Sequence, residues 1–314
     1  MALPTLLQSR LSLPLIGAPM FIISQPELVI AQCRAGIVGA FPALNARPSG
    51  VLDEWLHRLG SELTEQDAPF AVNLIVHRSN ARLDEDLALC VAHRAPIVIT
   101  SLGAREDVNA AIHSYGGIVL HDVINNRFAR KAIEKGADGL IAVAAGAGGH
   151  AGVQSPFALI QEIREWFDGP LALSGAIAHG RSIAAARALG ADLGYAGSLF
   201  IATQEANAAP AYKQAIVDCS ADDIVYSNLF TGVHGNYMRP SIVAAGLDPD
   251  NLPQSDPSKM DFAAIAADKK AWRDIWGCGQ GIGAIHAVEP AATVIARLKR
   301  EYGEALDRLC AGRA

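Results

Sequence analysis

Residues 170–200 read PLALSGAIAHGRSIAAARALGADLGYAGSLF and repeat one local pattern twice. The short apolar run PLALSG (170–175) precedes the helix-like run GRSIAAARALG, and a second short apolar run, DLGYAG (192–197), follows it. Short apolar runs separated by helical stretches are typical of βα units in a buried parallel sheet. Gly190 falls where a helix ends in left-handed geometry, which suits glycine. The segment therefore predicts two strands joined by a helix.

Six earlier runs have the same texture, with helical patterns such as PELVIAQCRA and RFARKAIEKG between them. They are LPLIGAP (13–19), IVGAF (37–41), FAVNLI (70–75), PIVITS (96–101), GIVLHD (117–122) and DGLIAVAA (138–145). Eight such units predict an α/β fold, a (β/α)8 TIM barrel, whose interior is filled by layers of side chains. A doubly wound open sheet is the alternative, because periodicity alone does not show closure.

The texture changes after Ala206. Residues 207–262 contain turn-rich segments such as TGVHGNYMRPS and GLDPDNLPQSDPSK. Two helical runs follow, at residues 262–276 and 289–310, separated by the glycine-rich GCGQGIGAIH. We expect residues 1–206 and part of the C-terminal helices to form the barrel. Residues 207–286 would form a cap over the barrel mouth, and residues 287–314 a C-terminal helix packed on the barrel.

Composition narrows the function classes. The formal net charge is -6 and the chain has no basic run, which disfavours nucleic acid and polybasic membrane binding. The chain lacks an apolar run of about 18 residues, so we expect no membrane span. The apolar stretch at residues 11–23 is interrupted by Pro14 and Pro19, unlike a signal peptide. The five cysteines are widely spaced without C-x-x-C, which favours a reducing, cytoplasmic location and no metal site.

The predicted strand ends carry small and polar residues, and barrel enzymes place their function at those ends. The last two strands end in SGAIAHGRS and AGSLF, which include Gly175, Ala176, Gly197 and Ser198. Loops at these positions often bind phosphate through free backbone N–H groups. Tight βα turns would select the same residues, so both interpretations stay open at this point.

The loop AAGAGGHAGVQSP after the sixth run contains a loose G-x-G-x-x-[GA] pattern. A dinucleotide fingerprint needs a helix that starts inside the motif. Here the helix is expected at Ser155-Pro156, so we read the loop as a flexible platform for His150. Imidazole titrates near neutral pH and makes His150 a candidate general base. The weaker candidates are His121, His179 and His234.

Six segments, taken in order, together resemble the nitronate monooxygenase (2-nitropropane dioxygenase) family of FMN-dependent barrels. They are GAPM (17–20), PFAVNL (69–74), KAIEKGADGLIAVAAGAGGHAG (131–152), LSGAIAHGRSIAAARALGAD (173–192), AGSLFIATQEA (196–206) and WGCGQGIGAI (276–285). The resemblance covers most of the chain and implies a TIM barrel with FMN at its mouth.

The resemblance also assigns site residues. His150 matches the family's catalytic histidine, the base that removes a proton from a neutral nitroalkane. With a preformed nitronate, protonated His150 would instead orient the anion. The residues expected to contact FMN are Ala18, Pro19 and Met20 along the isoalloxazine, Asn73, Gly148 and Gly149 around it, Gly175, Ala176, Gly197 and Ser198 at the phosphate, and Gln280 and Gly281 from the C-terminal segment.

Four positions depart from the family pattern. Val143 and Gly146 stand where the family often has Gln and Glu, Ala176 replaces a glycine, and His121 replaces a lysine. Residues 151–154 also lack the proline and acidic residues of the quinone-reductase relatives. These departures disfavour a quinone reductase and leave the substrate less determined than the cofactor.

The expected function is FMN-dependent oxidation of alkyl nitronates, and also of nitroalkanes, by O₂ to a carbonyl product and nitrite. The expected partners are the small-molecule nitronate and O₂, with a second copy of the chain as a candidate homodimer partner. One alternative is an NAD(P)H-dependent flavin oxidoreductase of the quinone or enoyl-thioester type. Another is a flavin-binding protein without fast turnover.

Overall fold

The computed structural model describes residues 3–48, 50–255 and 274–311. Of the helix predicted at residues 262–276, residues 262–273 lie outside the described residues. All eight predicted runs overlap a strand of one parallel sheet, and β2 and β5 each extend one residue beyond their runs. These strands are β1 (Leu15–Gly17), β2 (Gly39–Pro42), β3 (Phe70–Ile75), β4 (Ile97–Ser101), β5 (Ile118–Val123), β6 (Gly139–Val143), β8 (Leu171–Ser174) and β9 (Leu193–Ala196).

The sheet closes between its first and second strands. Its order is β1-β9-β8-β6-β5-β4-β3-β2, which leaves β1 and β2 as the two ends. A parallel bridge joins Ile16 to Val38, directly before β2, and the Gly17 amide donates to the Val38 carbonyl at 2.7 Å. The prediction of a (β/α)8 TIM barrel is therefore confirmed, and the doubly wound alternative is wrong.

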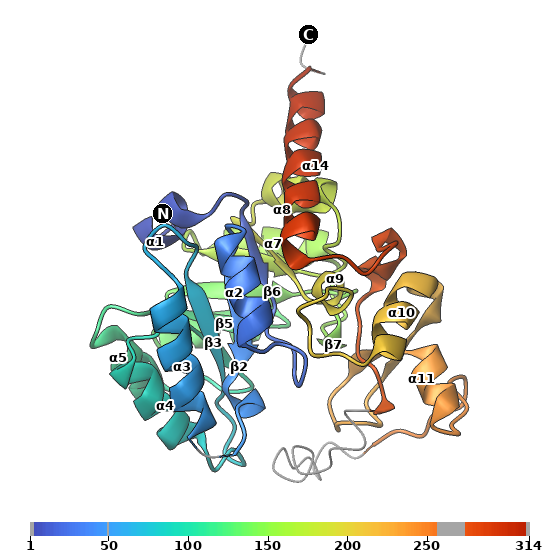
Figure 1. Ribbon diagram of the computed structural model, residues 1–314, viewed down its shortest axis with the longest axis horizontal. Helices are drawn as coiled ribbons and strands as arrows, with labels where there is room; N and C mark the ends of the chain where they lie inside the picture. The colour runs from blue at the N-terminus through green and yellow to red at the C-terminus, as the bar shows by residue number, and fades with distance from the viewer. Residues whose placement is uncertain (1–2, 49, 256–273, 312–314) are drawn as a thin grey trace.

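Helices follow the strands and cover the outside of the barrel (Figure 1). Pro26 and Pro156 lie in the first turns of their helices, and Gly190 ends another with φ 113°. These three positions match the sequence signals for helix starts and stops. The helices are α2 (Pro26–Arg34), α3 (Val51–Glu62), α4 (Leu83–Ala92), α5 (Glu106–His113), α6 (Asn126–Glu134), α7 (Pro156–Arg164) and α8 (Gly180–Leu189).

The barrel interior is filled by small and aliphatic side chains from alternate strand positions. This buried cluster includes Ile16, Val38, Ala40, Ala71, Ile97, Ile99, Leu120, Ile141, Ala172 and Leu193. Leu7 of α1 (Thr5–Arg10) belongs to the same cluster, so the N-terminal helix packs against the barrel interior. The aliphatic excess in the composition is explained by this interior and by the second cluster between strands and helices.

A second, antiparallel sheet lies outside the barrel. It consists of β7 (Gly149–His150), β10 (Ile224–Ser227) and β11 (Gly235–Met238), in the order β10-β11-β7. The turn signals of residues 207–262 gave no indication of it. Helices α10 (Pro210–Asp218) and α11 (Arg239–Ala244) lie on the same side of the molecule (Figure 1). Because β7 follows β6 by a short loop, this sheet joins β10 and β11 to the C-terminal end of β6.

The long helix α14 (Ala291–Ala311) packs against α8 and α2. Its buried residues, from Ala291 to Leu298, lie in its first half, and its second half extends beyond the barrel (Figure 1). The Gly180 amide donates to Glu301 Oε2 at 2.9 Å, and a Cβ at Gly180 would lie 2.2 Å from the Tyr302 nitrogen. The helix after β9, α9 (Ser198–Ile201), has only four residues. Helix α14 therefore occupies the place of the eighth barrel helix.

Candidate active site

A cavity of about 650 Å³, here called the wide cavity, opens at the C-terminal ends of the strands. Tyr212, Val233 and Trp276, which follow the barrel strands in the chain, also line it. Most of its exposed lining is apolar, as expected where a small ligand is kept from water. Nine of the predicted site residues line it: Ala18, Pro19, Met20, Asn73, Gly148, Gly149, His150, Gly197 and Ser198.

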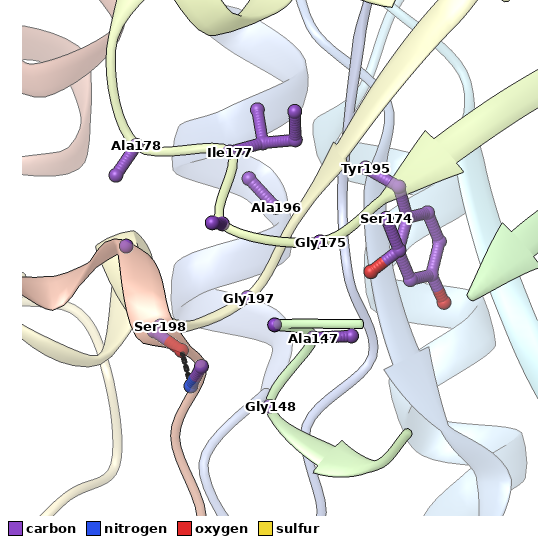
Figure 2. A pocket seen from close by; sticks show the side chains of 14 residues that line it. Ala147, Gly148, Ser174, Gly175, Ile177, Ala178, Tyr195, Ala196, Gly197 and Ser198 are labelled. Carbon is purple, nitrogen blue, oxygen red and sulfur yellow. Dashed lines mark hydrogen bonds between the residues drawn. The ribbon is translucent and has the colours of Figure 1, made fainter. Parts of the chain in front are cut away.

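A second cavity of about 20 Å³, here called the narrow cavity, shares lining residues with the wide one. Figure 2 shows the side chains that line the narrow cavity. It lies between the ends of β6, β8 and β9 and the segment around Gly279. Gly148, Ser174, Tyr195, Gly197 and Ser198 line both cavities. The predicted residues that line the narrow cavity are Gly148, Gly175, Ala176, Gly197, Ser198 and Gly281. The structure therefore brings together all but one of the predicted cofactor-binding residues.

The exception is Gln280, which is exposed and lines neither cavity. Its backbone amide donates to the Gly146 carbonyl at 2.9 Å, so its main chain holds the loop after β6. Its neighbour Gly279 lies on the narrow cavity instead and was not predicted. Ser174 and Tyr195 also line the narrow cavity and were not predicted. Each lies two residues after a barrel-interior residue of its strand, and therefore on the same face of that strand.

Glycines allow the loops around the narrow cavity to pack backbone against backbone. A Cβ at Gly148 would lie 2.7 Å from the Gly279 nitrogen, and one at Gly279 would lie 2.5 Å from the Gly146 carbonyl oxygen. Ser198 Oγ accepts a hydrogen bond from the Gly279 amide at 2.8 Å (Figure 2). The loop after β6 and the C-terminal segment are thus locked together beside β9.

Two of the four departures from the family pattern affect backbone geometry. Gly146 has φ 87°, a conformation that a glutamate would adopt only with strain. Ala176 has φ 54°, so this position carries an alanine where glycine is sterically preferred. The other two departures line the wide cavity, where Val143 is apolar and His121 takes the place of a flexible cation.

His150 is held by β7, since Gly149 and His150 pair with Asn236 and Gly235 of β11. The loop is therefore part of a small sheet and not the flexible platform expected from its glycines. His150 Nε2 lies 3.0 Å from the hydroxyl of Thr231. Burial lowers the His150 pKa to about 4, so the imidazole is neutral at pH 7. A neutral imidazole can accept a proton, and protonated His150 is not the resting form.

The three weaker histidine candidates lie in different settings. His121 Nδ1 lies 2.6 Å from Thr100 Oγ1, and burial lowers its pKa to about 4. His179 is the N-cap of α8 and lies outside the lining of both cavities. His234 is exposed and stacks on Tyr226, with ring centroids 5.0 Å apart. Only His121 joins His150 in lining the wide cavity.

Five polar side chains form the floor of the wide cavity, each two residues beyond a member of the apolar interior cluster. Residues two apart on a strand share a face, so these side chains form the last layer of the barrel interior. They are Asn73, Ser101, Asp122, Ser174 and Tyr195. Burial raises the pKa of Asp122 to about 6, against the opposing effect of a hydrogen bond from Ser101. The floor thus contains a carboxyl group that titrates near neutral pH.

Among residues 3–48, 50–255 and 274–311, no three His, Cys, Asp or Glu side chains gather where they could hold a metal ion. None of the helices in this part of the chain combines the length and apolar character needed to cross a bilayer.

The chain is a TIM barrel with two joined cavities at the C-terminal ends of its strands, which is where TIM-barrel enzymes have their active sites. The chain belongs to the nitronate monooxygenase family, a family of oxidoreductases, whose profile matches residues 5–300. A nitronate monooxygenase from Paraburkholderia phytofirmans is 26% identical, over 94% of this chain and 94% of that protein.

Two solved structures have the same architecture. FabK from Thermotoga maritima superposes with a TM-score of 0.81 at 25% identity, covering 98% of this chain and 97% of the other. Nitroalkane oxidase from Streptomyces ansochromogenes superposes with a TM-score of 0.82 at 23% identity, covering 97% and 100%. At 23% identity the second comparison supports the fold alone.

Proposed function

We propose that this enzyme uses FMN and O₂ to oxidise alkyl nitronates to a carbonyl product and nitrite. The observation that carries the proposal is the position of His150. Its neutral imidazole lines a largely apolar cavity that adjoins a narrow cavity bounded by backbone. Membership of the nitronate monooxygenase family supports the reaction class.

The narrow cavity fits a phosphate group. All the described side chains that line it are uncharged, so no carboxylate would repel an anion there. Glycines at 148, 175, 197, 279 and 281 leave the backbone accessible, and backbone N–H groups are common phosphate ligands. Gly175, Ala176, Gly197 and Ser198 would hold the phosphate, while Gly281 and the Gln280 main chain would close the site.

The wide cavity fits the isoalloxazine ring. Ala18, Pro19 and Met20 would lie along the ring, with Asn73, Gly148 and Gly149 around it. Bound FMN would supply electron transfer from the substrate to O₂. The protein would orient the ring and the substrate and exclude water, which its apolar lining favours.

His150 would act as the base for neutral nitroalkanes, since its imidazole is already unprotonated at pH 7. A preformed nitronate needs no proton removal. The low pKa changes the sequence-based expectation for this substrate, because His150 would contact the anion as a neutral hydrogen-bonding group. We further propose that the described part of residues 207–286, which is 207–255 and 274–286, acts as a cap, and that the enzyme works without a metal.

The direct test is aerobic turnover of the FMN-loaded protein with propyl-2-nitronate, followed by oxygen uptake and nitrite formation. We expect both to occur together, without NADH or NADPH. Nitrite at the level of a protein-free control would contradict the proposal. Tight FMN with no turnover of any nitronate or pyridine nucleotide would instead support a flavin-binding protein.

The similarity to FabK favours a second candidate, an NAD(P)H-dependent flavin oxidoreductase. Its hallmark would be rapid bleaching of the flavin by NADH or NADPH. Oxygen uptake that depends on a pyridine nucleotide, with no nitrite from nitronates, would favour this candidate.

A further inference from the structure

The floor of the wide cavity carries a chain of hydrogen bonds across β3, β4 and β5. Asn73 Nδ2 lies 3.0 Å from the Ile99 carbonyl oxygen and 2.7 Å from Ser101 Oγ. A carbonyl oxygen can only accept a hydrogen bond, so the Asn73 side chain must direct its NH₂ group toward it. The two amide hydrogens therefore go to Ile99 and Ser101. Ser101 Oγ in turn donates its hydrogen to Asp122 Oδ2 at 2.6 Å.

The direction of these hydrogen bonds determines which polar atoms of the floor remain available to a ligand. The remaining polar atoms of the chain are Asn73 Oδ1 and Asp122 Oδ1, and no described group donates a hydrogen bond to either. Both residues line the wide cavity. At Asn73 and Asp122 the floor therefore presents acceptor oxygens, one of which belongs to an ionisable group, and this part of the floor complements a ligand edge with N–H donors.

No other floor side chain carries a charge that compensates Asp122, and Lys131, which lines the wide cavity, is exposed and is not part of the floor. Among the described residues lining the wide cavity, Asp122 is the only carboxylic acid and Lys131 of α6 is the only lysine or arginine. His121 on β5 and His150 on β7 both have pKa values of about 4, so they are neutral at pH 7. Tyr195 on β9 is also neutral, since burial and the nearby Asp122 charge raise its pKa. Above pH 6 the floor thus carries a net negative charge.

We propose that the Asp122 carboxylate, held by Ser101, lowers the reduction potential of bound FMN. A negative charge on the floor disfavours the negative charge that reduction adds to the flavin. Charges interact far more strongly in a water-poor cavity than in bulk water. The inference rests on the proposed function, because it requires FMN in the wide cavity. It concerns the reduction potential of the flavin and not the removal of a substrate proton.

The test is the midpoint potential of the FMN-loaded protein, measured between pH 5 and pH 8. At pH 8, Asp122→Asn should raise the ratio of reduced to oxidised flavin at a fixed potential about tenfold, which is ~30 mV for a two-electron couple. At pH 5 the difference should nearly disappear, because wild-type Asp122 is then protonated. The matched control is Asp84→Asn, which alters a side chain that is 87% exposed and should leave the potential unchanged.

A second variant, Ser101→Ala, keeps the carboxylate but removes its hydrogen bond. That bond lowers the Asp122 pKa, so its loss should move the bend in the potential-against-pH curve to higher pH. This variant tests the same claim without Asp122→Asn. A bend at the wild-type pH in Ser101→Ala would count against the proposal.

The outcomes separate this inference from the proposed function. Bound FMN whose potential is the same in wild type and Asp122→Asn at pH 8 overturns the role of Asp122 and leaves nitronate oxidation standing. Failure of the wild-type protein to take up FMN, checked by flavin fluorescence, overturns both.

Discussion

The narrow cavity and the floor of the wide cavity lie at neighbouring strand ends, but different parts of the chain form them. Around the narrow cavity, glycines bring backbone within contact distance of backbone, as Gly148 and Gly279 do. On the floor, the polar groups that face the cavity belong to side chains, which are joined in the chain from Asn73 to Asp122. An added methyl group should therefore damage the first region sterically, whereas a change of side chain should alter the chemistry of the second.

The largest effect is expected at a side chain, His150. His150→Asn removes the base but retains a polar side chain of similar length. Turnover of neutral nitroethane should fall by about 10²–10⁴-fold, the usual contribution of a general base. Turnover of the preformed nitronate should fall much less, and FMN should stay bound. Steady-state oxygen uptake on both substrates measures the split, and wild-type turnover of nitroethane would disprove the assignment of the base.

The next effect is expected at the glycines. Gly148→Ala would place a Cβ 2.7 Å from the Gly279 nitrogen, a contact that only backbone movement can relieve. We expect a loss of about 3 kcal/mol in the free energy of unfolding, as for strong overpacking, together with weaker FMN binding. Urea unfolding and flavin fluorescence titration measure the two changes.

Gly303→Ala is the matched control, because a Cβ there meets nothing within 4 Å. It lies inside α14 and should stabilise the protein by about 0.5–1 kcal/mol through helix propensity. Equal stability of the two alanine variants would show that backbone packing does not limit the narrow cavity.

A smaller effect concerns pH and the buried side chains. His121 and His150 have folded-state pKa values of about 4, below the ordinary 6.5, so the unfolded chain binds their protons more readily. Their contribution to stability is complete above pH 6.5 and is lost as the pH falls toward 4. Asp122 acts in the opposite direction, because its raised pKa lets the folded state bind a proton below pH 6.

Two histidines outweigh one carboxyl group, so the free energy of unfolding should fall by about 2 kcal/mol between pH 7 and pH 5 from these three groups. Urea titrations at both pH values measure the change. In His121→Leu the fall should be smaller than in the wild type. If the free energy of unfolding of that variant fell as much as that of the wild type, His121 would not be held neutral in the folded protein.

The smallest effect is expected at Ala176, an exposed residue at φ 54° in the loop after β8. Ala176→Gly should raise the free energy of unfolding by about 1 kcal/mol, because left-handed geometry penalises a Cβ. Thermal unfolding measures it. Destabilisation by this substitution would indicate that the methyl group makes a packing contribution larger than its strain.

The barrel could be predicted because each strand is a local apolar run bounded by turn residues. The run FAVNLI coincides with β3, and GRSIAAARALG contains α8 with Gly190 at its end. The second sheet could not be predicted in this way. Strand β7 has two residues and pairs with β11, which is more than 80 residues later in the chain. No local pattern marks such a short strand.

In the site, too, some residues could be predicted from local sequence and others depend on long-range contacts. Its glycines and His150 stand out in the sequence because glycines cluster at strand ends. Asp122 ends a predicted strand too, but its pKa of about 6 arises from burial on a closed floor. The role of Gln280 depends on its main chain, which residue type does not reveal. Contacts that form only when the barrel closes were therefore missed.

The most direct test of the central claim is anaerobic reduction of the FMN-loaded protein. Propionate 3-nitronate, NADH and NADPH are added separately, and the flavin absorbance is followed. We predict rapid loss of the oxidised flavin spectrum with the nitronate and slow or no change with either pyridine nucleotide. Rapid bleaching by NADH or NADPH, with no response to the nitronate, would contradict the account.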